Sequence, residues 1–282
     1  MWGTKMMPSQ LFPEEVVNVD DYPVHERDNP ARAALVTRCR AGLDATMYCT
    51  IPNFVRPEAL AVMAAEATQL RPVAHDNNAN RNVYLQRQKD PSLPEDHPRN
   101  IFHPASVRMI AYDLIPSTSP LKTFYHWEAV RDMVAEIVGD TPLYDNEDPC
   151  QPANYACCED GDQSSWHYDS VNAFTMTLMV QAADEGGHFQ MSPNTRTDDD
   201  ENYDHVAQVL AGKRNDTIVE VAREPGALCI FRGCNSLHRV LPVKGNTMRI
   251  MGVFVYEKEP GVVGVREVNE TIYGRAPVKA AE

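Results

Sequence analysis

The second half of the chain is a succession of short β-type runs, and this pattern restricts the fold more than any other feature of the sequence. After residue 150, runs rich in β-branched and aromatic side chains are separated by Gly, Pro, Asn and Asp. The runs are AFTMTLMVQ, HFQMS, TIVEVA, ALCIFRG and MRIMGVFVYE. Short strands at such regular spacing predict an antiparallel β sandwich or barrel.

The first half of the chain is organised differently. Residues 1–30 are rich in Pro, Asp and Glu without hydrophobic periodicity, so we expect an arm that wraps the body or stays mobile. Apolar residues recur at helical intervals over residues 57–70 and 124–138, which predicts two supporting helices. The Pro-rich polar segment 81–104 between them is typical of a functional loop, and we expect it to form a lid over a pocket.

These patterns divide the chain into three regions, which we expect to form one integrated domain. The regions are an N-terminal arm (1–30), a helical support and lid region (31–149) and a β-rich catalytic core (150–282). A chain of 282 residues can form a hydrophobic core without disulfides or structural zinc.

Charge and composition exclude several classes of protein. Twenty-six basic and 40 acidic residues give a formal net charge of -14, which argues against nucleic acid as a partner. No apolar run approaches the roughly 20 residues of a membrane span, and the N-terminus lacks the pattern of a secretory signal. Seven cysteines, an odd number with no CxxC pair, suggest reduced thiols. We therefore expect a cytoplasmic protein that does not span a membrane.

Three residues have the types and spacing of an iron site. His167 and Asp169 lie two apart in WHYDSVNAF, so in a strand both side chains project from one face. Such a pair alone is common and fits a solvated strand end equally well. His238, in CIFRGCNSLHRV, follows another predicted strand and supplies a third ligand. Two histidines and one carboxylate form the facial triad of non-haem iron oxygenases. His126 and Glu128 have similar spacing but lie in a predicted helix, where their side chains diverge.

Arg249 supports an oxygenase over a generic metal site. It lies in TMRIMGVFVYE, on the predicted strand that follows His238. An arginine in this position can hold a carboxylate through two parallel hydrogen bonds. The cosubstrate 2-oxoglutarate needs such an anchor for its 5-carboxylate, because its 1-carboxylate and keto oxygen bind the iron. Considered alone, Arg249 would more often belong to a surface ion pair.

Two longer runs carry a resemblance to a known family. WHYDSVNAFTMTLMVQAADEGGHFQMSPNTR and PGALCIFRGCNSLHRVLPVKGNTMRIMGVFVYEKEPG resemble the BesD/HalD-type amino-acid halogenases and hydroxylases of the Fe(II)/2-oxoglutarate oxygenase superfamily. The resemblance spans about residues 150–261 and includes the HxD pair, a turn with Gly186, Gly187 and Phe189, the FRG and NSLHRV segments, and Arg249.

The resemblance implies both a fold and a set of cofactors. The fold is α+β with a mainly β core, a double-stranded β-helix of the jelly-roll or cupin-like type supported by N-terminal helices. The iron lies at one mouth of this β-helix. The implied cofactors are Fe(II), the cosubstrate 2-oxoglutarate and O2.

Asp169 distinguishes this chain from the halogenating members of that family. Those members have glycine in place of the carboxylate, which opens a coordination site for chloride. Because Asp169 is retained, the resemblance implies hydroxylation of a free amino acid or an amino-acid-derived metabolite, with release of succinate and CO2. A radical cyclase or desaturase with the same ligands is the alternative within catalysis. A non-catalytic cupin-like binding protein is the alternative from another class, and oxygen-dependent succinate formation would exclude it.

The remaining site residues follow from departures from the family pattern. Met251 stands where many relatives have Ser or Thr, so a second contact to the 5-carboxylate is expected from Arg232, Thr175 or Thr177. Lysine-acting members commonly carry an acidic residue at position 170, which argues against lysine as the substrate. We expect four residues to contact the substrate: Ser170, Asn172, Trp166 and Arg99. Arg99 is preferred over Arg81 and Arg108, two other arginines of the lid region. The oligomeric state stays open.

Overall fold

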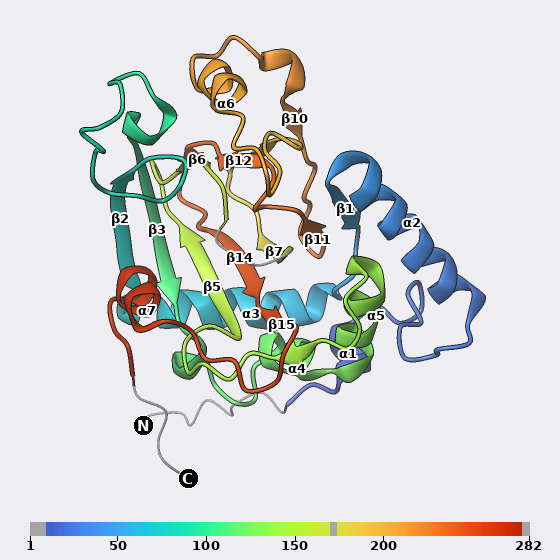
Figure 1. Ribbon diagram of the computed structural model, residues 1–282. Helices are drawn as coiled ribbons and strands as arrows, with labels where there is room; N and C mark the ends of the chain where they lie inside the picture. Colours follow the sequence, from blue (N-terminus) through green and yellow to red (C-terminus); the bar gives the residue numbers. More distant parts are fainter. Residues whose placement is uncertain (1–9, 170–173, 278–282) are drawn as a thin grey trace, which may run out of the picture.

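The predicted strands form one large antiparallel sheet (Figure 1). The structure is a computed structural model that describes residues 10–169 and 174–277. Within these residues the sheet has eleven strands in the order β1-β11-β7-β14-β5-β3-β6-β12-β9-β10, with β2 paired to β3. The strands are β1 (Tyr48–Ile51), β2 (His75–Arg81), β3 (His103–Ile110), β5 (Ala153–Cys158), β6 (Ser164–His167), β7 (Thr175–Gln181), β9 (Phe189–Ser192), β10 (Val219–Glu220), β11 (Leu228–Phe231), β12 (Leu237–Val240) and β14 (Arg249–Phe254).

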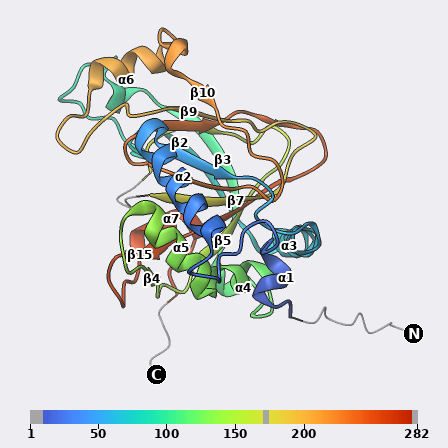
Figure 2. The ribbon, with the colours of Figure 1, turned by 90° about the vertical axis from the view of Figure 1, so that its right-hand side faces the viewer.

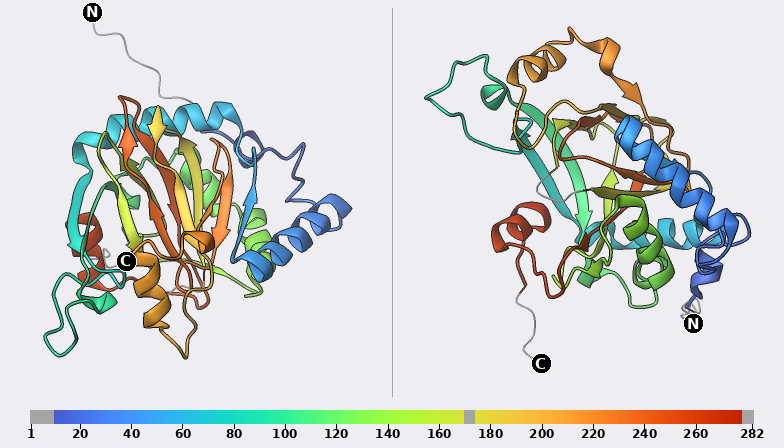
Figure 3. Two further views of the ribbon diagram at one scale, coloured as in Figure 1. Left: turned by 90° about the horizontal axis from the view of Figure 1, so that it is seen from above. Right: turned by 45° about the vertical axis from the view of Figure 1, so that its right-hand side comes forward.

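The sheet curls into two layers that face one another. In the side view β9 lies above β7 (Figure 2), and the view from above looks onto the faces of the layers (Figure 3). The layers are joined through β3, which pairs with β5 on one side and meets β6 at Ala105 and Ser164 on the other. Phe189 of β9 packs against Phe231 of β11 in the interior. This arrangement is the double-stranded β-helix, so the predicted fold class is confirmed. Two short pairs lie outside the main sheet: β8 (Glu185–Gly186) with β13 (Val243–Lys244), and β4 (Tyr144–Asp145) with β15 (Tyr256–Glu257).

Helices from the first half of the chain cover one layer of the sheet (Figure 2). Their apolar side chains join those of β7, β11 and β14 in the largest hydrophobic cluster. The apolar face of each helix is therefore buried against the sheet. Proline occupies a first-turn position in α2, α3 and α4, where its missing N–H costs nothing. The helices are α1 (Pro13–Val16), α2 (Pro30–Thr46), α3 (Pro57–Leu70), α4 (Pro120–His126), α5 (Glu128–Val138), α6 (Tyr203–Leu210) and α7 (Arg266–Tyr273).

The helix predicted over residues 124–138 is in fact two helices. Trp127 has an extended backbone, with φ -74° and ψ 110°, and separates α4 from α5. Its carbonyl accepts the first hydrogen bond of α5, from the amide of Val130 at 3.0 Å. His126 therefore ends one helix and Glu128 begins the next. Gly139 ends α5 in the left-handed conformation at φ 82°, as the sequence predicted.

Four strands, β1, β2, β3 and the short β4, come from the region in which we predicted only helices and a lid. The polar strand β2 (HDNNANR) pairs along β3 at the edge of the sheet, so it has no apolar periodicity by which it could be recognised. The described part of the N-terminal arm packs on the body, because Val16, Val17 and Val24 are buried. Short 3₁₀ helices occur at Arg71–Val73, Pro98–Asn100, Tyr112–Leu114 and Asn215–Thr217.

The segment predicted as a lid lies beside α6 at the end of the sheet where β6 and β12 are found (Figure 1). Val83 from this segment packs with Val206 and Val209 of α6 and with Trp166 and Leu237 of the sheet. The segment is therefore anchored through an apolar cluster on the outer side of β6 and β12. None of the described helices is long and apolar enough to cross a membrane.

Candidate metal centre and cosubstrate pocket

His167, Asp169 and His238 come together because β6 and β12 are neighbours. His167 and His238 are direct partners across the two strands, and Asp169 follows β6 by two residues. Asp169 Oδ1 lies 3.4 Å from His238 Nε2 and 3.8 Å from His167 Nε2. One ligand atom from each of the three residues lies within 4.8 Å of the others. Two imidazole nitrogens and one carboxylate oxygen in this geometry fit an Fe(II) ion with open coordination positions.

Backbone carbonyls fix both histidines in the tautomer that binds a metal. His167 Nδ1 lies 2.8 Å from the carbonyl of Ser165, and His238 Nδ1 lies 3.0 Å from the carbonyl of Ser236. A carbonyl only accepts, so Nδ1 donates in each case and the lone pair of Nε2 faces Asp169. Burial, followed by the nearby His238, holds the pKa of His167 well below its ordinary value. The neutral imidazole required of a metal ligand is therefore favoured.

The Asp169 carboxylate is held so that one oxygen stays available. The hydroxyl of Thr175 donates to Oδ2, and the amide of Asp169 donates to the carbonyl of Gly233 at 3.1 Å. A side chain at Gly233 would place its Cβ 2.0 Å from Oδ2, which explains the glycine of the FRG segment. Burial tends to raise the pKa of Asp169, but the facing His238 lowers it below the ordinary value. Oδ1 of a charged carboxylate therefore points to the histidines.

Arg249 opens on a cavity of about 290 Å³ between β7, β9 and the segment before β11. Its side chain is only 4% exposed, and its Nε and Nη2 have no hydrogen-bond partner among the described residues. Burial lowers its pKa to about 10, with Cys158 opposing and Arg223 adding to that shift. Gly187, at φ 63°, allows close approach, since a Cβ there would lie 2.8 Å from Arg249 Cδ. A buried cation with unpartnered donors fits a ligand carboxylate.

A second arginine, Arg223, lines the same cavity, and no pattern in the sequence singles it out. Its guanidinium carbon lies 3.5 Å from the centroid of the Phe189 ring and 5.2 Å from that of Phe231. Its Nη1 donates to Thr177 Oγ1 at 3.2 Å, while Nε and Nη2 have no partner among the described residues. Arg223 and Arg249 lie in separate segments of the chain, and they come together only because the sheet curls.

The other residues predicted to bind 2-oxoglutarate have other contacts. Thr175 donates to Asp169, and Thr177 accepts from Arg223. Arg232 donates to the carbonyl of Val138, at the end of α5, at 3.4 Å and does not line the cavity of Arg249.

The residues predicted to contact the substrate do not gather at one place either. Trp166 faces away from the metal ligands, and the guanidinium of Arg239 stacks on its ring at 4.4 Å. Arg99 donates to the hydroxyl of Tyr203 at 3.1 Å, in the cluster formed by the lid segment and α6. Ser170 and Asn172 lie outside the described residues.

Arg81 is the arginine of the lid region that the structure brings to the metal ligands. Its Nη2 donates to Ser164 Oγ at 3.3 Å, at the start of the strand that carries His167. Its Nε is buried without a partner among the described residues. Burial lowers the pKa of Arg81, and the negative charge of Asp169 opposes this shift, so the two charges interact across the centre.

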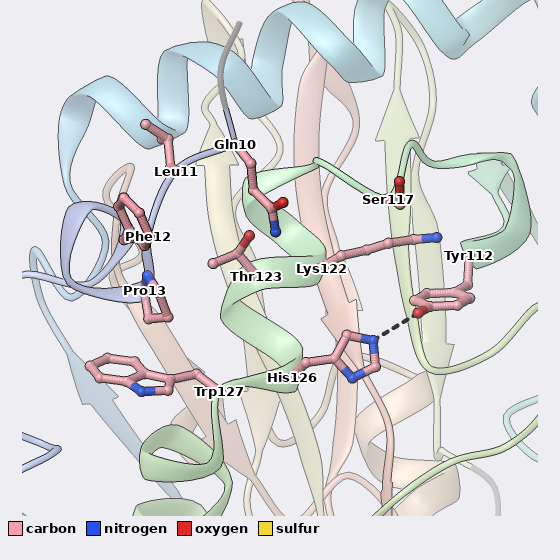
Figure 4. A pocket seen from close by; sticks show the side chains of 10 residues that line it. All are labelled: Gln10, Leu11, Phe12, Pro13, Tyr112, Ser117, Lys122, Thr123, His126 and Trp127. Atoms are coloured by element: carbon pink, nitrogen blue, oxygen red, sulfur yellow. Dashed lines mark hydrogen bonds between the residues drawn. The ribbon is translucent and has the colours of Figure 1, made fainter.

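A larger cavity, of about 580 Å³, lies elsewhere (Figure 4). It is bordered by Gln10 and by α4, and none of the predicted site residues lines it. The hydroxyl of Tyr112 lies 2.7 Å from His126 Nε2, and the ammonium of Lys122 lies 3.7 Å from the centroid of the Tyr112 ring. These polar groups already have partners, so we assign the cavity no role in the chemistry.

Comparison with solved structures supports the fold. The chain is similar to a 2OG-Fe(II) oxygenase family oxidoreductase from Burkholderia pseudomallei, with 14% identity and a TM-score of 0.50, over 80% of this chain and 92% of the other. A prolyl hydroxylase from Trichoplax adhaerens gives 14% identity and a TM-score of 0.52, over 80% and 90%. The epimerase SnoN, solved with Fe3+ and alpha ketoglutarate, gives 14% identity and a TM-score of 0.54, over 80% and 84%. A comparison with curated protein sequences finds no significant match.

The fold and the metal cluster together define the class of protein. A double-stranded β-helix with two histidines and one aspartate on adjacent strands is a 2-oxoglutarate-dependent non-haem iron oxygenase, an enzyme that uses Fe(II), 2-oxoglutarate and O2. Within that class the chain belongs to the halogenase D (HalD) family, whose sequence profile matches residues 31–265. The family resemblance expected from the sequence is confirmed.

Proposed function

We propose that this protein hydroxylates an unactivated C–H bond of a free amino acid or an amino-acid-derived metabolite. The observation that carries the proposal is the position of Asp169, whose carboxylate oxygen lies within 3.8 Å of both histidines. A halogenase of the resembled family has glycine at this position and admits chloride there. Asp169 fills that position, so a halide has no place among the ligands.

Each side chain has a distinct task in the proposed reaction. Fe(II) with 2-oxoglutarate and O2 supplies the oxidising chemistry when bound. His167, Asp169 and His238 would hold the metal through three positions, and the cosubstrate would take two of the other three. Arg249 would hold the 5-carboxylate of 2-oxoglutarate, because its Nε and Nη2 are buried and have no partner in the part of the chain that the structure describes.

The proposed substrate class is supported by Arg81. Its Nε is buried and has no partner among residues 10–169 and 174–277, and a substrate carboxylate would satisfy it. Ser170 and Asn172, adjacent in sequence to Asp169, remain proposed substrate contacts. We no longer propose Arg99 or Trp166, because their side chains are engaged on the outer side of the sheet. A cytoplasmic location fits the seven cysteines, all of which are unpaired.

The proposal is tested by product analysis. The protein is incubated with Fe(II), 2-oxoglutarate and a panel of free amino acids in air with excess chloride, and succinate and product masses are measured. We expect oxygen-dependent succinate and a product that has gained one oxygen atom, both absent in His238→Ala. A product that has lost two hydrogens would indicate a desaturase or cyclase instead. A chlorinated product from the parent protein would refute the role of Asp169.

A further inference from the structure

The cavity lined by Arg249 contains a second arginine where one carboxylate anchor was expected. Arg223 and Arg249 both line it, and the positive charge of Arg223 adds to the lowering of the Arg249 pKa. In both side chains the same two atoms, Nε and Nη2, have no hydrogen-bond partner among the described residues. These atoms form one edge of the planar guanidinium, the edge that matches the two oxygens of a carboxylate.

The acidic residues around the cavity do not neutralise the two guanidinium groups. Asp184 accepts from the turn after β13, at 2.7 Å from the amide of Asn246. Glu220 pairs with His188 at 3.0 Å. In the described part of the chain, no acidic side chain forms an ion pair with Arg223 or Arg249. Two neighbouring cations without a counter-charge repel one another, so an anion bound between them would be favoured.

The position of Arg223 is fixed by contacts that leave this edge free. Its guanidinium carbon lies 3.5 Å from the centroid of the Phe189 ring, and Nη1 donates to Thr177 Oγ1 at 3.2 Å. The ring contact and one hydrogen bond therefore orient the side chain, while Nε and Nη2 have no partner within the described ranges. A group held in this way loses little conformational entropy when it binds a ligand.

We propose that Arg223 is a second anchor for the distal carboxylate of 2-oxoglutarate, acting together with Arg249. The inference rests on the proposed function, in which 2-oxoglutarate is the cosubstrate. One carboxylate has about four lone-pair positions, enough to accept from both arginines at once. The two anchors would select a dicarboxylate over a 2-oxo acid with an apolar end.

Arg239 provides a matched control elsewhere in the chain. Like Arg223 it stacks on an aromatic ring, that of Trp166, at 4.4 Å. Its Nε and Nη2 are occupied, however, because both donate to Gln190 Oε1, at 3.0 and 2.7 Å. A substitution of Arg239 therefore removes the stacked cation without removing an open carboxylate-binding edge.

The experiment compares two ligands that differ only at the distal end. Binding of 2-oxoglutarate and of 2-oxopentanoate, which has a methyl group in place of the 5-carboxylate, is measured by calorimetry on the Fe(II)-loaded protein without oxygen. The variants are Arg223→Met, Arg223→Lys and Arg239→Met, each first checked for folding by thermal denaturation. Methionine retains the apolar contact with Phe189, and lysine retains the charge without the paired donors.

We expect Arg223→Met to lose at least about tenfold in affinity for 2-oxoglutarate, as is usual for a hydrogen bond to a charged group. Its affinity for 2-oxopentanoate should stay within a factor of about two, Arg223→Lys should be intermediate, and Arg239→Met should match the parent for both ligands. Equal losses for both ligands, or no loss for 2-oxoglutarate, would overturn the role of Arg223. A parent protein that binds both ligands equally would instead refute the proposed function.

Discussion

Thr175, which we predicted from the sequence to contact the cosubstrate, lies against the candidate metal ligand Asp169, and we propose that it positions that carboxylate. Its hydroxyl donates to Asp169 Oδ2, which leaves Oδ1 facing the two histidines. Gly233 keeps the space behind Oδ2 open, because any Cβ there would overlap it. The Asp169 carboxylate would therefore bind a metal through Oδ1 alone. Its other oxygen, Oδ2, would leave free the coordination positions needed by 2-oxoglutarate and O2.

Replacement of Thr175 by valine removes this hydroxyl and retains the shape of the side chain. We expect Thr175→Val to weaken Fe(II) binding roughly 10- to 100-fold, the usual cost of losing a group that orients a metal ligand. Thr175→Ser keeps the hydroxyl and should bind close to parent affinity. Anaerobic metal titration of the three proteins measures the effect. Equal affinity in the valine variant and the parent would show that Asp169 needs no such support.

The sequence predicts the metal ligands well but not their supports. His167 and Asp169 are two apart in a strand, so they share a face whatever the rest of the fold does. The roles of Thr175 and Arg223 depend instead on which strands become neighbours when the sheet curls. Thr175, at the start of β7, contacts Asp169, and Arg223 reaches the cavity from a segment without regular structure. No local pattern in the sequence records either contact.

At the level of elements, one half-buried carboxyl group joins a helix to the sheet. Glu66 of α3 accepts two hydrogen bonds on Oε1, from Ser119 Oγ at 2.6 Å and from the hydroxyl of Tyr155 at 2.8 Å. Burial raises the pKa of Glu66 above its ordinary value of 4.5, and these two hydrogen bonds and Lys122 offset that shift only in part. The protonated form is therefore more favoured in the folded protein than in the unfolded chain.

This shift predicts a pH dependence of stability. Because the folded pKa of Glu66 is raised, its contribution is present in full below the unfolded pKa and is lost as pH rises through the folded pKa. Glu66→Gln keeps an oxygen for both hydrogen bonds but cannot ionise. We expect the free energy of unfolding of the parent to fall, relative to this variant, as the pH rises through that interval. Urea denaturation across a pH series measures the difference, and parallel curves would contradict the prediction.

The elements that the sequence failed to predict share a physical cause. Strand β2 is polar along its length because it lies at the sheet edge, where only part of each side chain is buried. The helix breaks at Trp127 because the carbonyl of Trp127 accepts the first hydrogen bond of α5. The apolar spacing nevertheless continues across this break. Periodicity reports burial on one face, so it finds α3 and β7 but not exposed edges or breaks within an apolar stripe.

For the whole molecule, the seven cysteines predict a clear difference between folded and unfolded protein. All are unpaired, and six are buried, while Cys234 is partly exposed. Burial raises the pKa of Cys234, so its thiol should react more slowly than an ordinary one. We expect one slowly reacting thiol in the native protein, lost in Cys234→Ser, and seven after denaturation without reductant. Fewer than seven would reveal disulfides and contradict a reducing compartment.

The overall charge of the molecule opposes the ligand that its interior is built to bind. The formal net charge is -14, and the cavity that contains Arg223 and Arg249 is also lined by four acidic residues. Since 2-oxoglutarate carries two negative charges at neutral pH, it is repelled as it approaches and attracted only once it is inside. Salt screens the approach most strongly, because the Debye length falls from about 30 Å at 0.01 M to about 3 Å at 1 M.

Association of 2-oxoglutarate should therefore become faster as ionic strength rises, while dissociation, which depends on buried contacts with Arg249, should change less. Stopped-flow measurements on the Fe(II)-loaded protein without oxygen, over a series of salt concentrations, give both rate constants. The singly charged 2-oxopentanoate serves as the control and should show a shallower dependence on salt. An association rate that fell with salt would mean that the arginines, rather than the negative surface, dominate the potential along the entire path into the cavity.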